Sequence, residues 1–197
     1  MIGVLALQGA FQKHFECLQK LSQPAKLIRH PSELEDCMGL IIPGGETTAH
    51  LRLLTEPFWQ ALKSFGKVKP ILGTCCGLIL LSKEVFDNPV RTLKLMDIKV
   101  QRNAYGTQIA SFEDQVVTKI DHQEVLIKGC FIRAPKIVEI GLKVRVLATH
   151  QNCVVLVENS LHIASTFHPE VSMDLTLHEY FIRKCLKLNN SVLIKHL

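Results

Sequence analysis

The first 82 residues of the chain alternate short apolar runs with segments whose apolar residues recur at helical spacing. Strands that alternate with helices through short connections form a parallel sheet covered by helices on both faces. This pattern therefore predicts an α/β fold whose sheet is mainly parallel in the first half of the chain. The expected strands are 1–7, 26–29, 39–42 and 70–72, and the expected helices begin near Phe11 and cover 48–54, 57–65 and 77–82.

The second half of the chain has a different pattern. Stretches rich in β-forming residues are separated by polar or glycine-containing turns, which indicates antiparallel additions or the far edge of the same sheet. We expect Ser172 to cap a terminal helix that carries Leu175 and Phe181. Because no repeat or linker interrupts the chain, residues 1–197 are expected to form one domain. The expected strands of this half are 115–120, 124–132, 143–148, 153–157 and 161–164.

Composition and charge narrow the functional classes. The net charge is only +5 and aromatic residues make up 6% of the chain, so a nucleic-acid surface is not expected. The most apolar run, 71–81, is too short for a membrane span. The apolar N-terminus, whose first basic residue is Lys13, predicts a strand rather than a signal peptide. Seven cysteines, an odd number with no CxxC spacing, predict a reduced cytoplasmic protein without a zinc site.

The strongest local motif is an apolar strand at 71–72 that runs into Gly-Thr-Cys-Cys-Gly and then into an apolar helix. In a nucleophile elbow the turn is so sharp that only small residues fit around the nucleophile, which projects at the start of a helix. Cys75 has that position, and the N–H of Cys76 can face an oxyanion. The alternative is that Cys75 is a buried structural cysteine in a tight turn.

A second motif, Phe-His-Pro-Glu, covers residues 167–170. Residues two apart in an extended segment face the same side, so Glu170 can orient the ring of His168 for acid–base chemistry. A histidine near a glutamate is also common by chance. None of the other eight histidines has a comparable setting, and His178 lacks the second histidine of a zinc-protease motif.

A glycine-rich turn, Pro-Gly-Gly-Glu-Thr-Thr, follows an expected strand at 43–48. Two glycines allow positive φ and a close approach of the backbone to a ligand, and the N–H groups could bind an anion or an oxyanion. The alternative is an ordinary strand-to-helix turn with a threonine cap. Arg102 and Arg133 could each bind a substrate carboxylate, although a lone arginine is more often a solvated surface charge.

Together these motifs resemble the class I (triad) glutamine amidotransferases, and in more detail the glutaminase subunits of pyridoxal 5'-phosphate synthase. The resemblance extends from near residue 1 to about 170. It is specific because Phe-Ile-Arg-Ala-Pro and the Arg-Asn turn are not general features of other triad glutaminases. The segments in order are Leu-Gln-Gly-Ala at 7–10, the turn at 43–48, Gly-Thr-Cys at 73–75, Arg-Asn at 102–103, Phe-Ile-Arg-Ala-Pro at 131–135 and Phe-His-Pro-Glu at 167–170.

The resemblance implies a flavodoxin-like, three-layer α/β fold and a glutaminase that needs no metal or organic cofactor. Cys75 would be the nucleophile, His168 the general acid/base and Glu170 its orienter. L-Glutamine would give L-glutamate and ammonia, and the ammonia would pass to the synthase subunit of a hetero-oligomer that makes pyridoxal 5'-phosphate (vitamin B6). The resemblance further implies glutamine-binding residues Gly45, Glu46, Thr47, Arg102, Ile132 and Arg133, an oxyanion hole of Gly44, Gly45 and Cys76, and a partner interface at Gln8.

Three departures from the family pattern are expected to tune activity rather than remove it. Cys76 replaces the usual alanine and leaves open which cysteine attacks, although elbow geometry favours Cys75. Thr47 replaces a serine, and Ala-Tyr at 104–105 replaces Ser-Phe. The alternative functions are a triad glutaminase of another synthase, such as imidazole glycerol phosphate synthase, a catalytically silent partner-binding subunit, and a cysteine hydrolase acting on peptides or esters.

Overall fold

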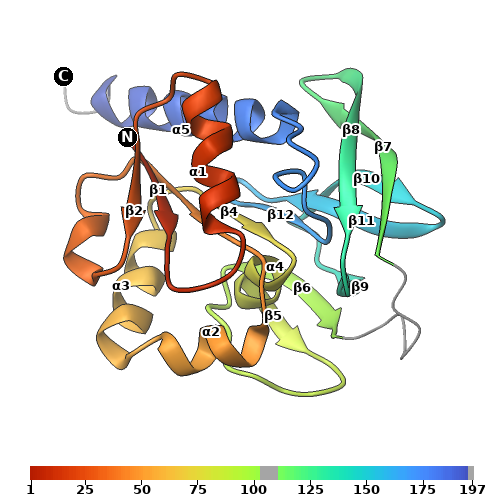
Figure 1. Cartoon of the computed structure of the whole chain (residues 1–197), viewed down its shortest axis with the longest axis horizontal. Coiled ribbons are helices and arrows are strands. Elements are labelled where there is room, and N and C mark those ends of the chain that lie inside the picture. The colour runs from red at the N-terminus through yellow and green to blue at the C-terminus, as the bar shows by residue number, and fades with distance from the viewer. Residues whose placement is uncertain (103–110, 195–197) are drawn as a thin grey trace.

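A nine-stranded sheet runs through the centre of the structure, a computed structural model that describes residues 1–102 and 111–194 (Figure 1). Its first five strands are parallel to one another, and four antiparallel strands continue it. The prediction of a mainly parallel sheet with antiparallel additions is therefore confirmed. In sheet order the strands are β2 (Ala25–Ile28), β1 (Ile2–Leu5), β3 (Gly39–Ile42), β4 (Ile71–Thr74), β12 (Ile163–Ser165), β11 (Cys153–Glu158), β10 (Arg145–His150), β7 (Phe112–Ile120) and β8 (Gln123–Phe131).

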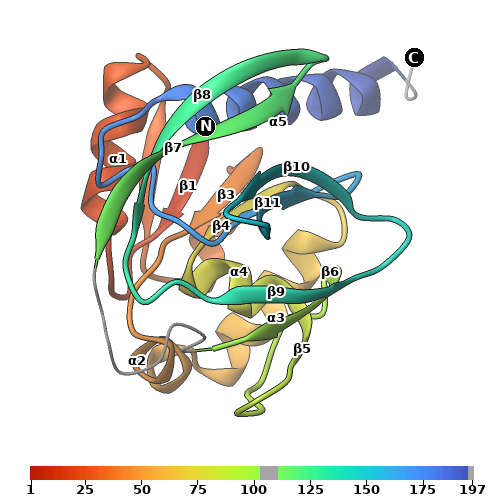
Figure 2. The same ribbon diagram turned by 90° about the vertical axis from the view of Figure 1, so that its right-hand side faces the viewer.

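Helices cover both faces of the sheet: α1 (Phe11–Lys20), the 3-10 turn η1 (Pro31–Leu34), α2 (Thr47–Leu53), α3 (Glu56–Gly66), α4 (Cys76–Leu81) and α5 (Thr176–Ile194). Residues of β1 alternate between two cores, as a strand buried on both faces requires. Ile2 belongs to the core that contains Leu18 of α1 and Phe181 of α5, whereas Leu5 belongs to the core that contains Trp59 of α3. Figure 2 shows α5 on one side of the sheet and α3 on the other, so the molecule has three layers. No helix in the described ranges is both long and apolar enough to cross a membrane.

A smaller sheet of three strands packs against the α3 and α4 side: β5 (Ser82–Val85), β6 (Met96–Gln101) and β9 (Lys136–Ile140). Met96 and Ile137 from these strands enter the core that contains Trp59. The sequence pattern did not predict these strands as separate elements. Two of them are short, and the exposed Lys83 and Glu84 occupy the middle of β5, so the local signal for a strand is weak.

The start of the terminal helix differs from the prediction. Ser172 does not cap it, because the helix begins at Thr176 and the Ser172 hydroxyl donates instead to Glu113 Oε1 at 3.2 Å. The Thr176 N–H donates to Asp174 Oδ1 at 2.9 Å, so an aspartate two residues further on satisfies the first turn.

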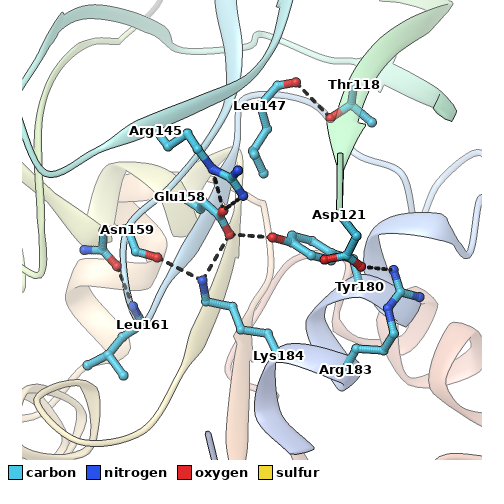
Figure 3. A network of polar contacts seen from close by, with 10 residues as sticks. All are labelled: Thr118, Asp121, Arg145, Leu147, Glu158, Asn159, Leu161, Tyr180, Arg183 and Lys184. Carbon is cyan, nitrogen blue, oxygen red and sulfur yellow. Dashed lines mark hydrogen bonds and ion pairs between the residues drawn. The ribbon is translucent and has the colours of Figure 1, made fainter. Parts of the chain in front are cut away.

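A buried ion-pair network joins α5 to the antiparallel part of the sheet (Figure 3). Glu158, at the end of β11, is 6% exposed. Arg145 Nε lies 3.0 Å from its Oε1, and Tyr180 Oη and Lys184 Nζ lie 2.8 and 3.0 Å from its Oε2. Burial acts to raise the pKa of Glu158, but these donors hold it below its ordinary value. Because Tyr180 and Lys184 both lie on α5, one carboxylate fastens the helix to the sheet.

His162 is a buried histidine just before β12 that the fold keeps neutral. Its Nδ1 accepts a hydrogen bond from the N–H of Ile71 at 3.2 Å, at the start of β4. Burial, together with the charge of Lys184, lowers the pKa of His162 from 6.5 to about 4. The unfolded chain therefore binds a proton near pH 6.5 that the folded protein takes up only near pH 4. Stability present above pH 6.5 is lost as the pH falls through this window.

We expect His162→Asn to flatten this pH dependence, because asparagine can accept the Ile71 hydrogen bond but does not titrate. The difference in unfolding free energy between pH 7 and pH 4 should shrink by on the order of 2 kcal/mol. Urea unfolding at the two pH values measures it. His122→Asn, at an exposed position, is the control and should leave the pH dependence as in the wild type. An unchanged dependence in His162→Asn would contradict the assignment.

Candidate active site

The nucleophile elbow lies between β4 and α4. Cys75 has φ 46° and ψ −100°, a backbone conformation that non-glycine residues rarely adopt and that is held by its surroundings. Glycines on both sides allow the turn by leaving room for backbone. A Cβ on Gly73 would lie 2.6 Å from the carbonyl carbon of Gly77, and one on Gly77 would lie 2.1 Å from the Ile42 oxygen. The strand–turn–helix arrangement of the motif is therefore present, with Cys75 at its apex.

The ring of His168 lies between Cys75 and Glu170. Its Nδ1 is 2.7 Å from Glu170 Oε1, and Cys75, whose Sγ lies 3.9 Å from the Ile132 carbonyl oxygen, is among the groups that raise the pKa of the ring. The backbone of His168 pairs with Cys130 of β8 through two hydrogen bonds of 2.8 and 3.1 Å, which fix the backbone position from which the ring extends. Burial lowers the pKa of His168, but the neighbouring Cys75 and Glu170 outweigh it and raise the pKa.

Glu170 is fully buried and supports His168 from behind. Burial raises its pKa, but the neighbouring His14 and His168 reverse that effect and hold the pKa well below its ordinary value. His14 Nε2 lies 3.4 Å from Glu170 Oε1, and His14 Nδ1 lies 2.8 Å from His178 Nε2. The prediction that no other histidine has a comparable setting is therefore wrong: two more gather behind this carboxylate. The spacing of apolar residues predicts a helix around His14 but does not single this residue out, because one histidine in an amphipathic helix carries no functional signal by itself.

Gly44 and Gly45 are required because other side chains pack closely against the glycine-rich turn. Among the described glycines only Gly9 has a positive φ, +83°, so Gly44 and Gly45 do not use the positive φ that glycine allows. A Cβ on Gly44 would lie 2.2 Å from His168 Cε1, and one on Gly45 would lie 2.5 Å from the side-chain oxygen of Gln8. The predicted close approach of the backbone is present, and it is made to the chain's own side chains.

Backbone groups of this turn are already engaged. The Gly44 N–H donates to Thr74 Oγ1 at 3.0 Å, in the strand that carries the nucleophile. Gln8, expected at a partner interface, binds the turn itself: its side-chain amide donates to the Glu46 carbonyl at 3.0 Å and accepts from the Glu46 N–H at 3.4 Å. The Glu46 carboxylate caps α2 by accepting from the N–H groups of Thr48 and Ala49, which lowers its pKa.

Cys76, the residue after the nucleophile candidate, does not line the cavity beside Cys75. It is fully buried, and its Sγ lies 3.2 Å from Nδ1 of His50, a ring that also contacts the amide of Gln8. Burial raises the pKa of the Cys76 thiol to about 12, so this sulfur stays protonated. Because Cys76 is buried and protonated whereas Cys75 lines the cavity, Cys75 is the favoured nucleophile. Sequence reasoning missed His50, because it lies one turn into α2 without a neighbouring motif.

A cavity of about 480 Å³ opens over Cys75. It brings together residues that are far apart in the sequence, from the turns after β3 and β4 and from the segment that follows β8. Glu170 and Cys76 lie behind its wall, and Gln8 is not among its lining residues. Asn103 and the Ala-Tyr pair at 104–105 lie outside the described residues. The predicted residues that line the cavity are Gly44, Gly45, Glu46, Thr47, Cys75, Arg102, Ile132, Arg133 and His168.

Comparison with known proteins gives one family and a set of close relatives. The model of the SNO glutamine amidotransferase family matches residues 4–187. A pyridoxal 5'-phosphate synthase subunit PdxT of Thermosipho africanus (strain TCF52B) is 44% identical over 190 residues, 94% of this chain and 99% of the relative. A protein of the same name from Oenococcus oeni (strain ATCC BAA-331 / PSU-1) is 42% identical over 183 residues, 92% of this chain and 95% of the relative.

Solved structures are also similar. One described as a glutamine amidotransferase has a TM-score of 0.86 and 37% identity, and the match covers 93% of this chain and 98% of that one. Another, described as PurLQS from Thermotoga maritima, has a TM-score of 0.69 and 14% identity, and the match covers 98% of each chain. At the lower identity the likeness is one of fold alone.

Proposed function

Since the chain belongs to the SNO glutamine amidotransferase family, we propose that it is the glutaminase subunit of a pyridoxal 5'-phosphate synthase. It hydrolyses L-glutamine to L-glutamate and delivers the ammonia for pyridoxal 5'-phosphate synthesis. Its fold is the flavodoxin-like, three-layer α/β fold of class I glutamine amidotransferases. The observation that carries the proposed mechanism is that Cys75 lines the same cavity as His168, whose ring is hydrogen-bonded to Glu170.

The first half of the reaction forms a thioester. The Cys75 thiolate attacks the side-chain carbonyl carbon of glutamine, and the carbonyl oxygen becomes an oxyanion. Of the expected donors, the Gly44 N–H is already bonded to Thr74, so we assign the oxyanion to the N–H groups of Gly45 and Cys76, a contribution usually worth several kcal/mol. His168, whose raised pKa keeps it protonated, gives its proton to the departing nitrogen, and the C–N bond breaks to release ammonia.

The second half removes the thioester. His168, now neutral, takes a proton from a water molecule that attacks the γ-glutamyl carbon, and the C–S bond breaks to return the Cys75 thiolate and a protonated His168. The net reaction converts glutamine and water into glutamate and ammonia. Glu170 keeps the proton of the ring on Nδ1, so that the other ring nitrogen faces the sulfur throughout.

Two arginines in the cavity wall suit a substrate that carries the carboxylate of an amino acid. Arg133, with φ 44°, follows Ile132 at the end of β8, and Arg102, which follows β6, lines the same cavity. We assign these guanidinium groups to the glutamine α-carboxylate, which a planar fork binds in two-pronged fashion. Thr47 and the backbone of Gly45 and Glu46 complete the assigned glutamine site.

Ammonia is useful to a synthase only while it is unprotonated, and bulk water at neutral pH protonates it. The names of the relatives describe one component of a synthase. We propose that this chain docks on the synthase subunit of a hetero-oligomer, with Gln8 near the contact. We further propose that the chain acts as one domain in the cytoplasm.

Glutamate release from glutamine, with and without a pyridoxal 5'-phosphate synthase subunit, tests the function. We expect the rate to rise when the synthase subunit is added, because docking gives the ammonia a protected path and completes the site. Stimulation by an imidazole glycerol phosphate synthase subunit instead would reassign the partner. An absence of glutamate release under every condition would reject the glutaminase and leave a silent docking subunit.

A further inference from the structure

We propose that His14 is a positioning residue for the glutaminase reaction, acting as a second imidazole on the carboxylate that orients His168. The inference rests on the proposed function, since it assigns a role within that reaction. His14 lies on α1, outside every motif that the resemblance identified, and it does not line the cavity.

The Glu170 carboxylate is enclosed in a way that makes each of its contacts count. Glu170 and His14 are both fully buried, and His168 is 5% exposed. A carboxylate away from water must be compensated by donors or cations. Oε1 lies 2.7 Å from His168 Nδ1 and 3.4 Å from His14 Nε2, whereas Oε2 has no hydrogen-bond partner among the described residues. The two imidazoles therefore share the task of holding this charge.

His14 is itself fixed from two sides. Its Nδ1 lies 2.8 Å from Nε2 of His178 on α5, and its Nε2 lies 3.1 Å from Thr74 Oγ1 on β4. Thr74 immediately precedes the nucleophile and also accepts the Gly44 N–H at 3.0 Å. One buried ring thus contacts the strand of the nucleophile, the terminal helix and the triad carboxylate, which come from three separate parts of the chain.

This position fits orientation rather than substrate binding. The single Nε2–H of His14 lies between Thr74 Oγ1 and Glu170 Oε1, so the carboxylate cannot rotate away without losing this contact, and Oε1 stays in place for the Nδ1–H of His168. That hydrogen bond sets the tautomer in which the other ring nitrogen faces Cys75. Loss of the His14 donor should therefore slow the proton transfers, while glutamine binding at the cavity is left intact.

The matched pair His14→Gln and His14→Asn tests the role. A glutamine amide can reach the place of Nε2 and keep the donor to Glu170, whereas an asparagine amide reaches only the place of Nδ1 and keeps the contact to His178. In the assembled synthase complex we expect His14→Asn to lower kcat by roughly 10- to 100-fold, with KM for glutamine within about twofold of the wild type. His14→Gln should recover kcat to within about threefold of the wild type.

Thermal unfolding of each variant separates positioning from packing. His162→Asn, at a buried histidine outside the site, is the control: it should lower the melting temperature without lowering kcat. Equal kcat for the wild type and His14→Asn, or equal loss in both His14 variants, would overturn the positioning role alone. A wild-type complex without glutaminase activity would overturn both proposals. If His14→Asn does not fold, His14→Leu takes its place, and the same kcat difference from His14→Gln is required.

Discussion

Replacing Cys75 by alanine lowers the kcat for glutamine hydrolysis by at least about 10³-fold in the presence of the synthase subunit. The reason is that the variant has no group at the apex of the elbow that can form the thioester. Its fold should survive, since Cys75 is small and its backbone conformation is imposed by the packing of Gly73 and Gly77 around it. Glutamate release at saturating glutamine measures the loss.

Cys76→Ala is the matched control, because it changes the neighbouring cysteine while leaving the backbone N–H in place. Its sulfur is buried against His50 and stays protonated, so we expect at least about a third of the wild-type kcat to remain. The reverse result, activity retained in Cys75→Ala and lost in Cys76→Ala, would move the nucleophile by one residue. Equal activity of Cys75→Ala and the wild type would reject a covalent mechanism at this elbow.

Replacing Glu158 by alanine has the largest effect on stability that we expect. The substitution leaves Lys184, whose side chain is 14% exposed, and the hydroxyl of Tyr180 without their shared acceptor. Removing one partner of a buried pair costs about 3–5 kcal/mol, because the remaining charge is left uncompensated. For a chain of this length that corresponds to a fall in melting temperature on the order of 10 °C.

Thermal and urea unfolding of the isolated chain measure this change. Glu113→Ala is the control: it removes an exposed carboxylate that pairs with Lys128 at 2.7 Å, and the melting temperature should stay close to that of the wild type. If Glu158→Ala melted with the control, the network would be a surface feature rather than the attachment of α5.

Much of the fold could be predicted from local patterns in the sequence. The strand 39–42 has the predicted bounds, and the strand, elbow and helix around Cys75 follow from one run of apolar and small residues. His168 and Glu170 could be paired because their contact depends on a spacing of two in the chain. Such features depend on residues that are close in the sequence, so the spacing of apolar residues and the residue types of the turns predict them.

The rest of the site depends on contacts between distant segments. The approach of His14 to Glu170 joins residues 156 positions apart by their numbers, and no local period encodes it. The sequence motif at 44 and 45 allows either positive φ or a close approach of the backbone, and only the fold shows that the His168 ring and the Gln8 amide pack on these glycines. Asp174 rather than Ser172 satisfies the start of α5, since the place where the terminal helix begins is decided by how the preceding loop packs.

The backbone pairing of His168 with Cys130 decides what a cleaved chain can do. The nucleophile follows β4 in the first half of the chain, but the acid that serves it lies in the second half, where its backbone is hydrogen-bonded to β8. Neither half holds a complete set of reacting groups without the other. A chain cleaved between residues 102 and 111 therefore gives two inert fragments, and glutamine hydrolysis reports on their reassembly.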